Sequence, residues 1–274
     1  MELITNHSKE ISNIISLFYL DYPMGSYIPK WKVFRAFTNE NKTIAEHIAN
    51  TSLWKKSELK KVLDIGTGDG LVLANLCLLS TKLPQKVTLV EPNNTLLIEA
   101  KNQIEELHQN IEIQAYCNEI NQLLPDVFSG IDLVLIAHVL YLIPTNDMEN
   151  IINSLPLNIP LIIVTDSRNS LFPKCWEVTA PKYFKRSQYI HKFIASLDRN
   201  KFTIKESSFK TYLKNPFKID RVELMNSVLS LICYTDYENL SISDKSAIFD
   251  LVSKHSIGGL TFCNSICYEI VRIY

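Results

Sequence analysis

The sequence contains few glycines and no excess of either charge. Only 7 glycines and 11 prolines occur among 274 residues, which leaves no room for long low-complexity linkers. The formal net charge is −1, whereas proteins that grip nucleic-acid phosphates usually carry a basic excess. Hydrophobic residues make up 46% of the chain, enough for a substantial core. We therefore expect a globular protein that does not bind nucleic acid.

Long apolar runs and paired cysteines are also missing. The longest apolar run, residues 131–144, is interrupted by Asp132 and His138 and is too short to span a bilayer. The first residues do not have the charged start and apolar core of a signal peptide. No C-x-x-C pair or zinc spacing occurs among the six cysteines, which are Cys77, Cys117, Cys175, Cys233, Cys263 and Cys267. These absences predict a cytoplasmic protein with reduced cysteines, no membrane contact and no bound metal.

Strand and helix patterns alternate from Lys61 onward. Runs of Val, Ile and Leu predict strands at 62–65, 86–90, 111–116, 131–136 and 161–165, with helices at 71–79 and 95–107. Strands that are apolar throughout are typical of a parallel sheet covered by helices on both faces. Further strands are expected at 202–209 and 265–273. The sequence thus predicts an α/β fold with a doubly wound, mostly parallel seven-stranded sheet.

Helical patterns flank this alternation. Residues up to about 54 read as helices interrupted near 22–25, and further helices are expected at 187–197, 222–234 and 244–255. We divide the chain into an N-terminal helical lid, residues 1–54, and an α/β domain, residues 55–274, with a helical insertion near 215–258. The lid and the insertion are expected over the carboxyl ends of the strands, where open α/β sheets bind ligands.

A glycine-rich loop follows the first predicted strand, with the sequence Asp64-Ile65-Gly66-Thr67-Gly68-Asp69-Gly70. A dinucleotide fingerprint, G-x-G-x-x-G, would face a pyrophosphate, but here the third glycine comes one residue early. The two aspartates suit a cationic, amine-bearing ligand better than a pyrophosphate. Glu91 ends the second strand, where a carboxylate can accept both hydroxyls of a ribose. The alternative is a glycine turn in some other doubly wound fold.

The loop together with Glu91 resembles the first two motifs of class I S-adenosylmethionine-dependent methyltransferases. The resemblance covers about residues 61–165 and implies a Rossmann-like methyltransferase fold with S-adenosyl-L-methionine as cofactor. It implies that the cofactor-binding residues are Asp64, Gly66, Thr67, Gly68, Glu91, Pro92, Cys117, Asn118, Ala137 and His138. In that scheme the glycines line the methionine and ribose, the pair at 117–118 lies beside the adenine, and the pair at 137–138 faces the methyl sulfonium.

Three segments resemble small-amine N-methyltransferases of the histamine N-methyltransferase type, namely 90–93, 132–142 and 259–265. This resemblance implies that four residues line the acceptor site, His138, Tyr141, Trp176 and Asn264. The chain departs from that family where glutamine is replaced by His138, tyrosine by Leu142 and asparagine by Cys263. The family's N-terminal substrate glutamate has no assigned counterpart, and Glu40 and Glu46 are candidates for it.

Motifs of other methyltransferase groups are missing. No Asn/Asp-Pro-Pro-aromatic turn follows the fourth strand, the two-glutamate loop of arginine methyltransferases is absent, and Asp166 alone offers an acidic metal ligand near strands four and five. We expect the protein to transfer a methyl group to an amine or imidazole nitrogen of a small molecule. We expect it to act as a monomer or dimer. A small-molecule O-methyltransferase and a non-catalytic cofactor-binding subunit remain alternatives.

Each acceptor-site residue has an assigned role and a structural alternative. His138 would accept a proton and Asn264 would orient the acceptor, while Tyr141 and Trp176 would shield positive charge. Alternatively, His138 bonds a neighbouring carbonyl, Asn264 caps backbone groups, and Trp176 belongs to the core. The aromatic stretch at 18–31 is expected to pack within the lid.

Overall fold

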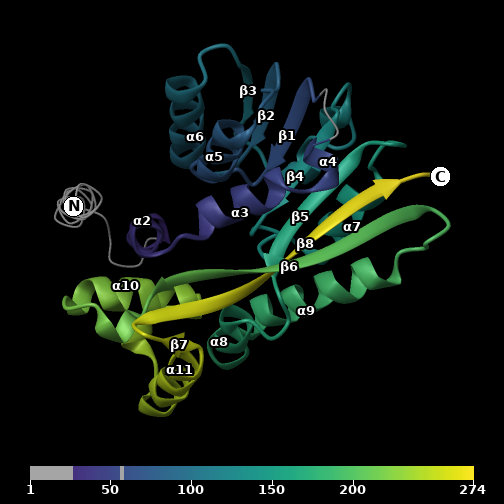
Figure 1. Cartoon of the computed structure of the whole chain (residues 1–274). Helices are drawn as coiled ribbons and strands as arrows, with labels where there is room; N and C mark the ends of the chain where they lie inside the picture. The colour runs from purple at the N-terminus through teal and green to yellow at the C-terminus, as the bar shows by residue number, and fades with distance from the viewer. Residues whose placement is uncertain (1–26, 56–58) are drawn as a thin grey trace. The chain divides into compact units, whose positions relative to one another are not determined.

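A computed structural model describes residues 27–55 and 59–274 (Figure 1). The N-terminal part contains α2 (Tyr27–Phe37), α3 (Glu40–Ala49) and α4 (Ser52–Lys55). The alternating part contains β1 (Lys61–Ile65), α5 (Leu71–Leu79), β2 (Lys86–Val90), α6 (Asn94–Leu107), β3 (Glu112–Tyr116), β4 (Leu133–Ala137), α7 (Thr145–Asn153) and β5 (Pro160–Asp166). The rest contains α8 (Leu171–Thr179), α9 (Pro181–Ser196), β6 (Phe202–Lys214), α10 (Val222–Cys233), α11 (Ile242–Lys254), β7 (Ser256–Ile257) and β8 (Leu260–Arg272). The helix predicted around residues 11–18 lies outside the described residues.

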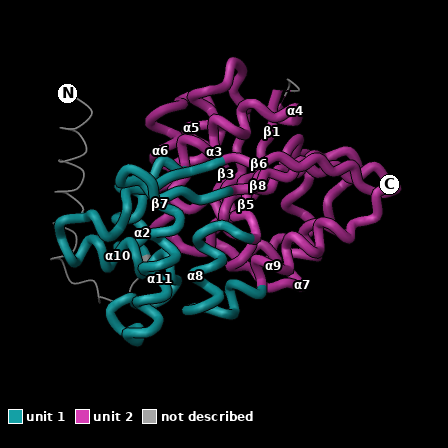
Figure 2. The backbone as a smooth tube through the Cα atoms, turned by 60° about the horizontal axis from the view of Figure 1, so that its bottom comes forward, with its two compact units in different colours: residues 1–40, 169–185, 210–264 teal, residues 41–168, 186–209, 265–274 magenta. Residues whose placement is uncertain are grey.

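The chain forms two compact units (Figure 2). We call residues 41–168, 186–209 and 265–274 the sheet unit, and residues 27–40, 169–185 and 210–264 the described part of the helical unit. The chain passes from one unit to the other within β6 and again within β8. Residues 41–54, expected in the N-terminal lid, belong to the sheet unit, whereas 169–185 join the helical unit. That the helical unit acts as a lid stays a prediction.

The strands form one sheet in the order β3-β2-β1-β4-β5-β8-β6, and the short β7 pairs with β8 as an eighth strand. The pairs among β1 to β5 are parallel, and β8 runs antiparallel to β5. This order confirms the predicted doubly wound, mostly parallel sheet. The order reverses at β1, which lies between β2 and β4, and such a switch point is where open α/β sheets bind ligands.

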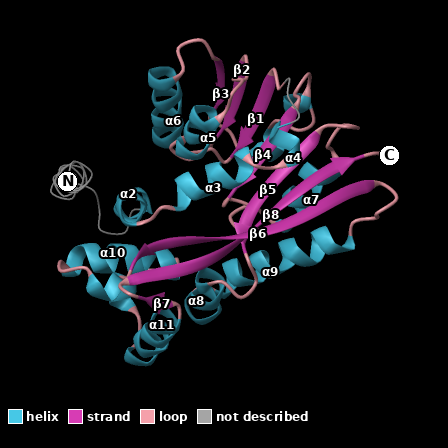
Figure 3. Ribbon diagram, viewed as in Figure 1, coloured by secondary structure: helices cyan, strands magenta, loops and turns pink. Residues whose placement is uncertain are grey.

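Helices cover both faces of the sheet in the sheet unit (Figure 3), and each face has its own hydrophobic core. On the first, which we call the α5/α6 face, buried strand residues pack with α3, α5 and α6; they include Val62, Leu133, Leu135, Ile162, Val164 and Cys267. On the second, the α7/α9 face, alternate residues pack with α7 and α9; they include Leu63, Ile65, Val134, Ile136, Leu161, Ile163 and Tyr268. The strands are apolar throughout because both of their faces are buried.

Several element boundaries differ from the predicted ones. β8 begins at Leu260 rather than 265, because Gly258 and Gly259 take positive φ values of 62° and 91° and turn the chain from β7 into β8. α9 begins at Pro181 rather than 187, since proline is accepted in the first turn of a helix. The helices α7 and α8 were not predicted. α8 carries Pro173 in its first turn, where the sequence pattern looks like a break.

The helical unit has an aromatic core of its own. α10 packs against α2 and α8, and α11 packs against α8. The ring of Trp176 lies 6.1 Å from that of Phe172 and 6.1 Å from that of Tyr234, in both cases between centroids. Phe34 meets Phe172 edge-on at 5.7 Å. Trp176 is 1% exposed and lies among these rings.

Candidate active site

The glycine loop joins β1 to α5 and depends on left-handed backbone. Gly66, Gly68 and Gly70 have φ values of 69°, 56° and 76°. A Cβ on Gly66 would lie 2.5 Å from a Val139 methyl, and one on Gly70 would lie 2.8 Å from the Ala100 Cα. Glycine at these two positions therefore lets the loop approach the segment after β4 and the helix α6. The backbone amide of Gly66 donates to the Val90 carbonyl at 2.7 Å, which ties the loop to the end of β2.

Asp64 is buried beneath this loop. Its Oδ2 accepts a hydrogen bond from the Thr67 hydroxyl at 2.7 Å. Burial raises the pKa of Asp64 to about 7; the Thr67 hydrogen bond opposes this shift and the charge of Glu91 adds to it. A neighbouring cation would favour the ionised form, because it would offset the cost of burying the charge. A positively charged ligand beside Asp64 would therefore lower its pKa and favour the carboxylate.

Glu91 links the glycine loop to the turn after β2. Its Oε2 accepts a hydrogen bond from the backbone N–H of Gly68 at 3.1 Å, and its Oε1 accepts one from the backbone N–H of Asn93 at 3.0 Å. The residue is 8% exposed, and burial raises the pKa of its carboxyl. A carboxylate has about four lone-pair sites, so both oxygens keep capacity for further donors. The carboxylate is thus held in place while it retains the ability to bind two hydroxyls.

Three further predicted cofactor residues lie at the ends of β2 and β3. The Cys117 Sγ lies 3.5 Å from the Pro92 carbonyl oxygen, and the amide of Asn118 donates to Gln122 Oε1 at 3.0 Å. Cys117 and Pro92 are exposed and Asn118 is half-buried. Pro92 follows Glu91 directly, and Cys117 follows Tyr116, the strand partner of Val90. The structure therefore brings the predicted set from Asp64 to Asn118 to the carboxyl ends of β1, β2 and β3.

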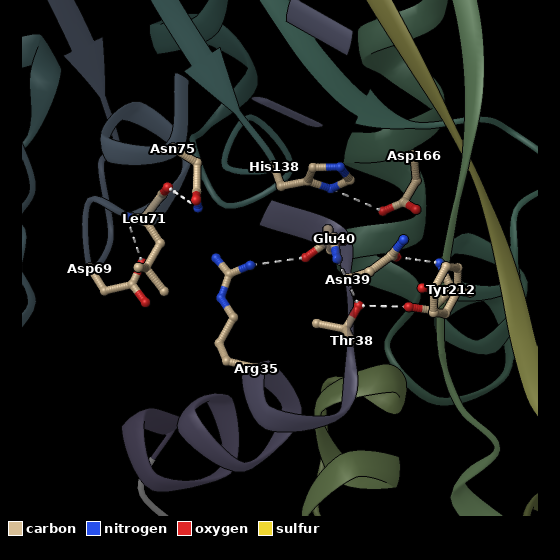
Figure 4. A network of polar contacts seen from close by, with 10 residues as sticks. All are labelled: Arg35, Thr38, Asn39, Glu40, Asp69, Leu71, Asn75, His138, Asp166 and Tyr212. Atoms are coloured by element: carbon tan, nitrogen blue, oxygen red, sulfur yellow. Dashed lines mark hydrogen bonds and ion pairs between the residues drawn. The ribbon is translucent and has the colours of Figure 1, made fainter. Parts of the chain in front are cut away.

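His138 occupies a strained position directly after β4. Its φ is 53°, a left-handed value that costs a non-glycine residue roughly 1–2 kcal/mol. Its amide donates to the Val164 carbonyl at 2.8 Å. The turn directs the ring toward Asp166 at the end of β5, and His138 Nδ1 lies 3.5 Å from Asp166 Oδ2 (Figure 4). Both side chains are largely buried, with 11% and 3% exposed.

The backbone carbonyl of Asp166 is held by His191 of α9. The His191 Nε2 lies 2.8 Å from the Asp166 carbonyl oxygen, and its Nδ1 lies 2.7 Å from the Tyr268 hydroxyl. Because a carbonyl only accepts, Nε2 donates and Nδ1 accepts from the tyrosine in the neutral ring. Burial lowers the pKa of His191, which favours this neutral form. Sequence analysis considered Asp166 only as a metal ligand and missed its pairing with His138.

The other predicted acceptor-site residues are divided between the units. Tyr141 is half-buried and packs in the α7/α9 core of the sheet unit. Trp176 and Asn264 belong to the helical unit, where the backbone N–H of Asn264 donates to the Ser170 hydroxyl at 3.0 Å. Glu40 forms an ion pair with Arg35 at 3.2 Å, whereas the Glu46 side chain is 48% exposed. The structure thus brings His138 and Asp166 together and leaves the roles of the other residues as predictions.

Over residues 27–55 and 59–274, no helix has the length and apolar character needed to cross a membrane. In the same residues no three His, Cys, Asp or Glu side chains are grouped as metal ligands.

Solved structures share this fold at low sequence identity. YcgJ from Bacillus subtilis is 11% identical with a TM-score of 0.54, over 86% of this chain and 99% of that one. A putative methyltransferase from Bacillus halodurans C-125 is 15% identical with a TM-score of 0.54, again over 86% and 99%. The plantazolicin methyltransferase BamL, solved with SAH and a triazolic desmethylPZN analogue, is 15% identical with a TM-score of 0.48, over 85% of each chain. No model of a known protein family matches the sequence, and no curated protein is similar to it. The chain therefore has the Rossmann-like α/β methyltransferase fold.

Proposed function

We propose that this protein is an S-adenosylmethionine-dependent methyltransferase that acts on a small molecule. The observation that carries the proposal is the left-handed glycine loop after β1 with the Glu91 carboxylate held 3.1 Å from the Gly68 amide. A fold shared with a protein described as a putative methyltransferase supports it.

The residues around the loop fit the proposed cofactor. S-adenosylmethionine carries an amino group, a ribose with two hydroxyls and an electrophilic methyl group on a sulfonium. Glu91 would accept the ribose hydroxyls, and Asp64 would face the cationic amino acid end. Cys117 and Asn118 would border the adenine, and Ala137 would adjoin the sulfonium. The raised pKa of Asp64 agrees with a carboxyl placed for a positive ligand.

His138 and Asp166 would prepare the acceptor. Methyl transfer requires a lone pair on the nucleophile, so a protonated amine must first lose its proton, and a neutral N–H or O–H acceptor loses its proton as the methyl group is transferred or afterwards. His138 would take that proton, and Asp166 would orient the imidazole and stabilise its protonated form. Tyr141 and Trp176 would shield positive charge at the acceptor, as the resemblance implies.

The acceptor that we favour is a small amine or imidazole, in line with the resemblance to small-amine N-methyltransferases. A small hydroxyl compound is the second candidate, because a buried histidine beside a carboxylate is also suited to deprotonating an alcohol or phenol. The two classes differ in the product, a methylated nitrogen or a methyl ether.

The test has two steps. Isothermal titration calorimetry should show that the purified protein binds S-adenosylhomocysteine at a single site. Incubation with S-adenosylmethionine and a panel of small amines, imidazoles and phenols should then yield S-adenosylhomocysteine and one class of methylated product, identified by mass spectrometry. Failure to bind S-adenosylhomocysteine would refute the proposal.

A further inference from the structure

Ser265 is a buried hydroxyl directly opposite Asp166. In the antiparallel pairing of β5 with β8, Asp166 is the partner of Ser265. Ser265 is 1% exposed, and its Oγ has no hydrogen-bond partner among the described residues. Buried hydroxyls in folded proteins are nearly always hydrogen-bonded, because burial removes the water that would otherwise bond them. The Ser265 hydroxyl is therefore available to hydrogen-bond a ligand.

The pairing register places Ser265 and Asp166 on one face of the sheet. The preceding pair, Val164 and Cys267, contributes both side chains to the core of the α5/α6 face. Side chains alternate along a strand, so Asp166 and Ser265 project from that same face. Directly opposed residues of an antiparallel pair have Cβ atoms about 4.5–5.5 Å apart. The Ser265 hydroxyl and the Asp166 carboxylate therefore neighbour each other at the end of β5.

His138 joins this pair from the end of β4. An extended residue after Ala137 would point to the α7/α9 face, because Ala137 packs against the α5/α6 core. The left-handed φ of 53° breaks this alternation and brings the His138 ring within 3.5 Å of the Asp166 carboxylate. Three polar groups from three adjacent strands thus gather at the carboxyl end of the sheet, where ligands of this fold class bind.

Asn264 does not share this arrangement. It precedes Ser265 in β8, and burial alternates along the strand, with Cys263, Ser265 and Cys267 buried and Asn264 half-buried. The side chain of Asn264 therefore points to the opposite face of β8 from Ser265. The resemblance to amine methyltransferases pointed to Asn264, whereas the register points to its neighbour.

We propose that Ser265 and Asp166 form the acceptor subsite and select acceptors that carry an N–H or O–H group. The Asp166 carboxylate accepts a hydrogen bond from this N–H or O–H group. The hydroxyl of Ser265 makes a second hydrogen bond to the same polar group. A carboxylate has enough lone pairs to serve both His138 and the acceptor. This subsite rests on the proposed methyltransferase function and specifies its substrate class, namely small molecules with a hydrogen-bearing nucleophile.

Matched probes test this selection. The protein loaded with S-adenosylhomocysteine is titrated by NMR with imidazole and 1-methylimidazole, and with phenol and anisole, so that each pair differs by one N–H or O–H. The wild type should bind imidazole or phenol roughly tenfold more tightly than its methylated counterpart, the scale of one hydrogen bond to a polar ligand. Ser265→Ala should remove most of that preference.

Thr165 provides the matched control. The Oγ1 of Thr165 is also buried without a hydrogen-bond partner among the described residues, and Thr165 as a whole is 1% exposed. Thr165 pairs with Ile266, which packs on the α7/α9 face. Thr165→Val should therefore keep the wild-type preference. Ser265→Cys, which keeps the side-chain shape with a slightly larger atom and replaces the hydroxyl with a weak donor, is measured in the same way if Ser265→Ala fails to fold.

Each outcome decides the proposal. A preference that is lost in Ser265→Ala and kept in Thr165→Val supports it. Equal binding within both probe pairs, equal losses in the two variants, or no binding of any probe overturns it. Affinity for S-adenosylhomocysteine is measured in parallel and should be unchanged in all variants. Its absence from the wild type would instead refute the proposed methyltransferase function.

Discussion

At Glu91, one carboxylate holds the protein's own loop and is proposed to hold a ligand. Because its oxygens accept from the Gly68 and Asn93 amides, the carboxylate is positioned before any ligand arrives. Glu91→Ala should weaken S-adenosylhomocysteine binding by about 2–4 kcal/mol, since two charge-assisted hydrogen bonds are lost. Calorimetry measures the change.

Glu91→Gln serves as the control for loop structure. It keeps one oxygen for the backbone amides but removes the charge, so its affinity should fall between those of the wild type and Glu91→Ala. Unchanged affinity in both variants would contradict the assignment of Glu91 to the ribose.

Asp64 should link cofactor binding to proton release. The pKa of Asp64 in the folded protein is about 7, above the usual value for an aspartate. Between about pH 4 and 7, Asp64 is therefore mostly protonated in the folded protein and mostly ionised in the unfolded protein. Folding stability therefore falls as pH rises through that window, because the folded state binds more protons than the unfolded state. A cationic ligand beside Asp64 favours the carboxylate, so binding below about pH 7 should release a proton.

The proton release can be counted by calorimetry. S-adenosylhomocysteine is titrated at about pH 6.5 in buffers of different ionisation enthalpy, which report protons released on binding. The wild type should release a substantial fraction of a proton and Asp64→Asn much less. The same proton count in both proteins would show that Asp64 does not face the charged end of the ligand.

His138 should affect turnover without affecting the cofactor. If the imidazole takes the acceptor's proton, His138→Ala should lower kcat by at least roughly tenfold while the Kd for S-adenosylhomocysteine stays constant. Asp166→Asn should shift the acidic limb of the pH–rate profile, because the protonated imidazole loses its partner. A parallel loss of cofactor affinity in His138→Ala would mean that the acceptor site lies elsewhere.

The sequence predicts those candidate residues whose signal is local. Glycines and acidic residues at strand ends point to Asp64, Gly68 and Glu91 because contact with the proposed ligand would demand those residue types. The pairing of His138 with Asp166 depends on a left-handed turn, and that of Asp166 with Ser265 depends on strand register. Neither leaves a trace in the order of residues along the chain.

At the level of elements, the glycine loop is required by packing as well as by any ligand. A Cβ at position 66 would meet Val139 at 2.5 Å, and a residue there must also accept a φ of 69°. Gly66→Ala should destabilise the fold by about 1–3 kcal/mol through overpacking, in addition to the cost of left-handed backbone. Urea denaturation measures the change in unfolding free energy.

Gly130→Ala isolates the packing contribution. Gly130 has a similar φ of 67°, but the nearest atom to its added Cβ is the flexible Lys61 Nζ at 3.2 Å. Both variants suffer the left-handed backbone cost, so the difference between them reports the contact with Val139. Equal destabilisation would mean that the Val139 segment moves aside without cost.

Element prediction succeeded where apolar runs are continuous and failed where prolines or turns decide a boundary. β1, β2 and α5 follow directly from the spacing of Val, Ile and Leu, since both faces of the sheet are buried. α8 was missed because Pro173, acceptable in a first turn, looks like a helix breaker. The early start of β8 depends on a glycine pair whose turn only the strand pairing reveals.

At the level of the whole molecule, the described helices of the helical unit are unequally buried. In α10 every residue from Ser227 to Cys233 is buried, whereas in α11 only Ile248 and Val252 are. Ile242 and Phe249 of α11 are 89% and 50% exposed. We therefore expect α11 and its turns to open more readily than α8 and α10, which are more deeply buried.

These differences lead to a prediction about closure. Methyl transfer from a sulfonium requires that water be excluded, so a surface segment should become ordered when the site is filled. We expect the amides of α11 to exchange rapidly in the free protein and more slowly with S-adenosylhomocysteine and imidazole bound together, while α10 stays protected throughout as an internal reference. Hydrogen exchange with mass spectrometry, compared for the free protein, the S-adenosylhomocysteine complex and the ternary mixture, measures this. Full protection of α11 in the free protein, or exchange that no ligand changes, would show that the helical unit is not a lid and that any acceptor site is built in advance.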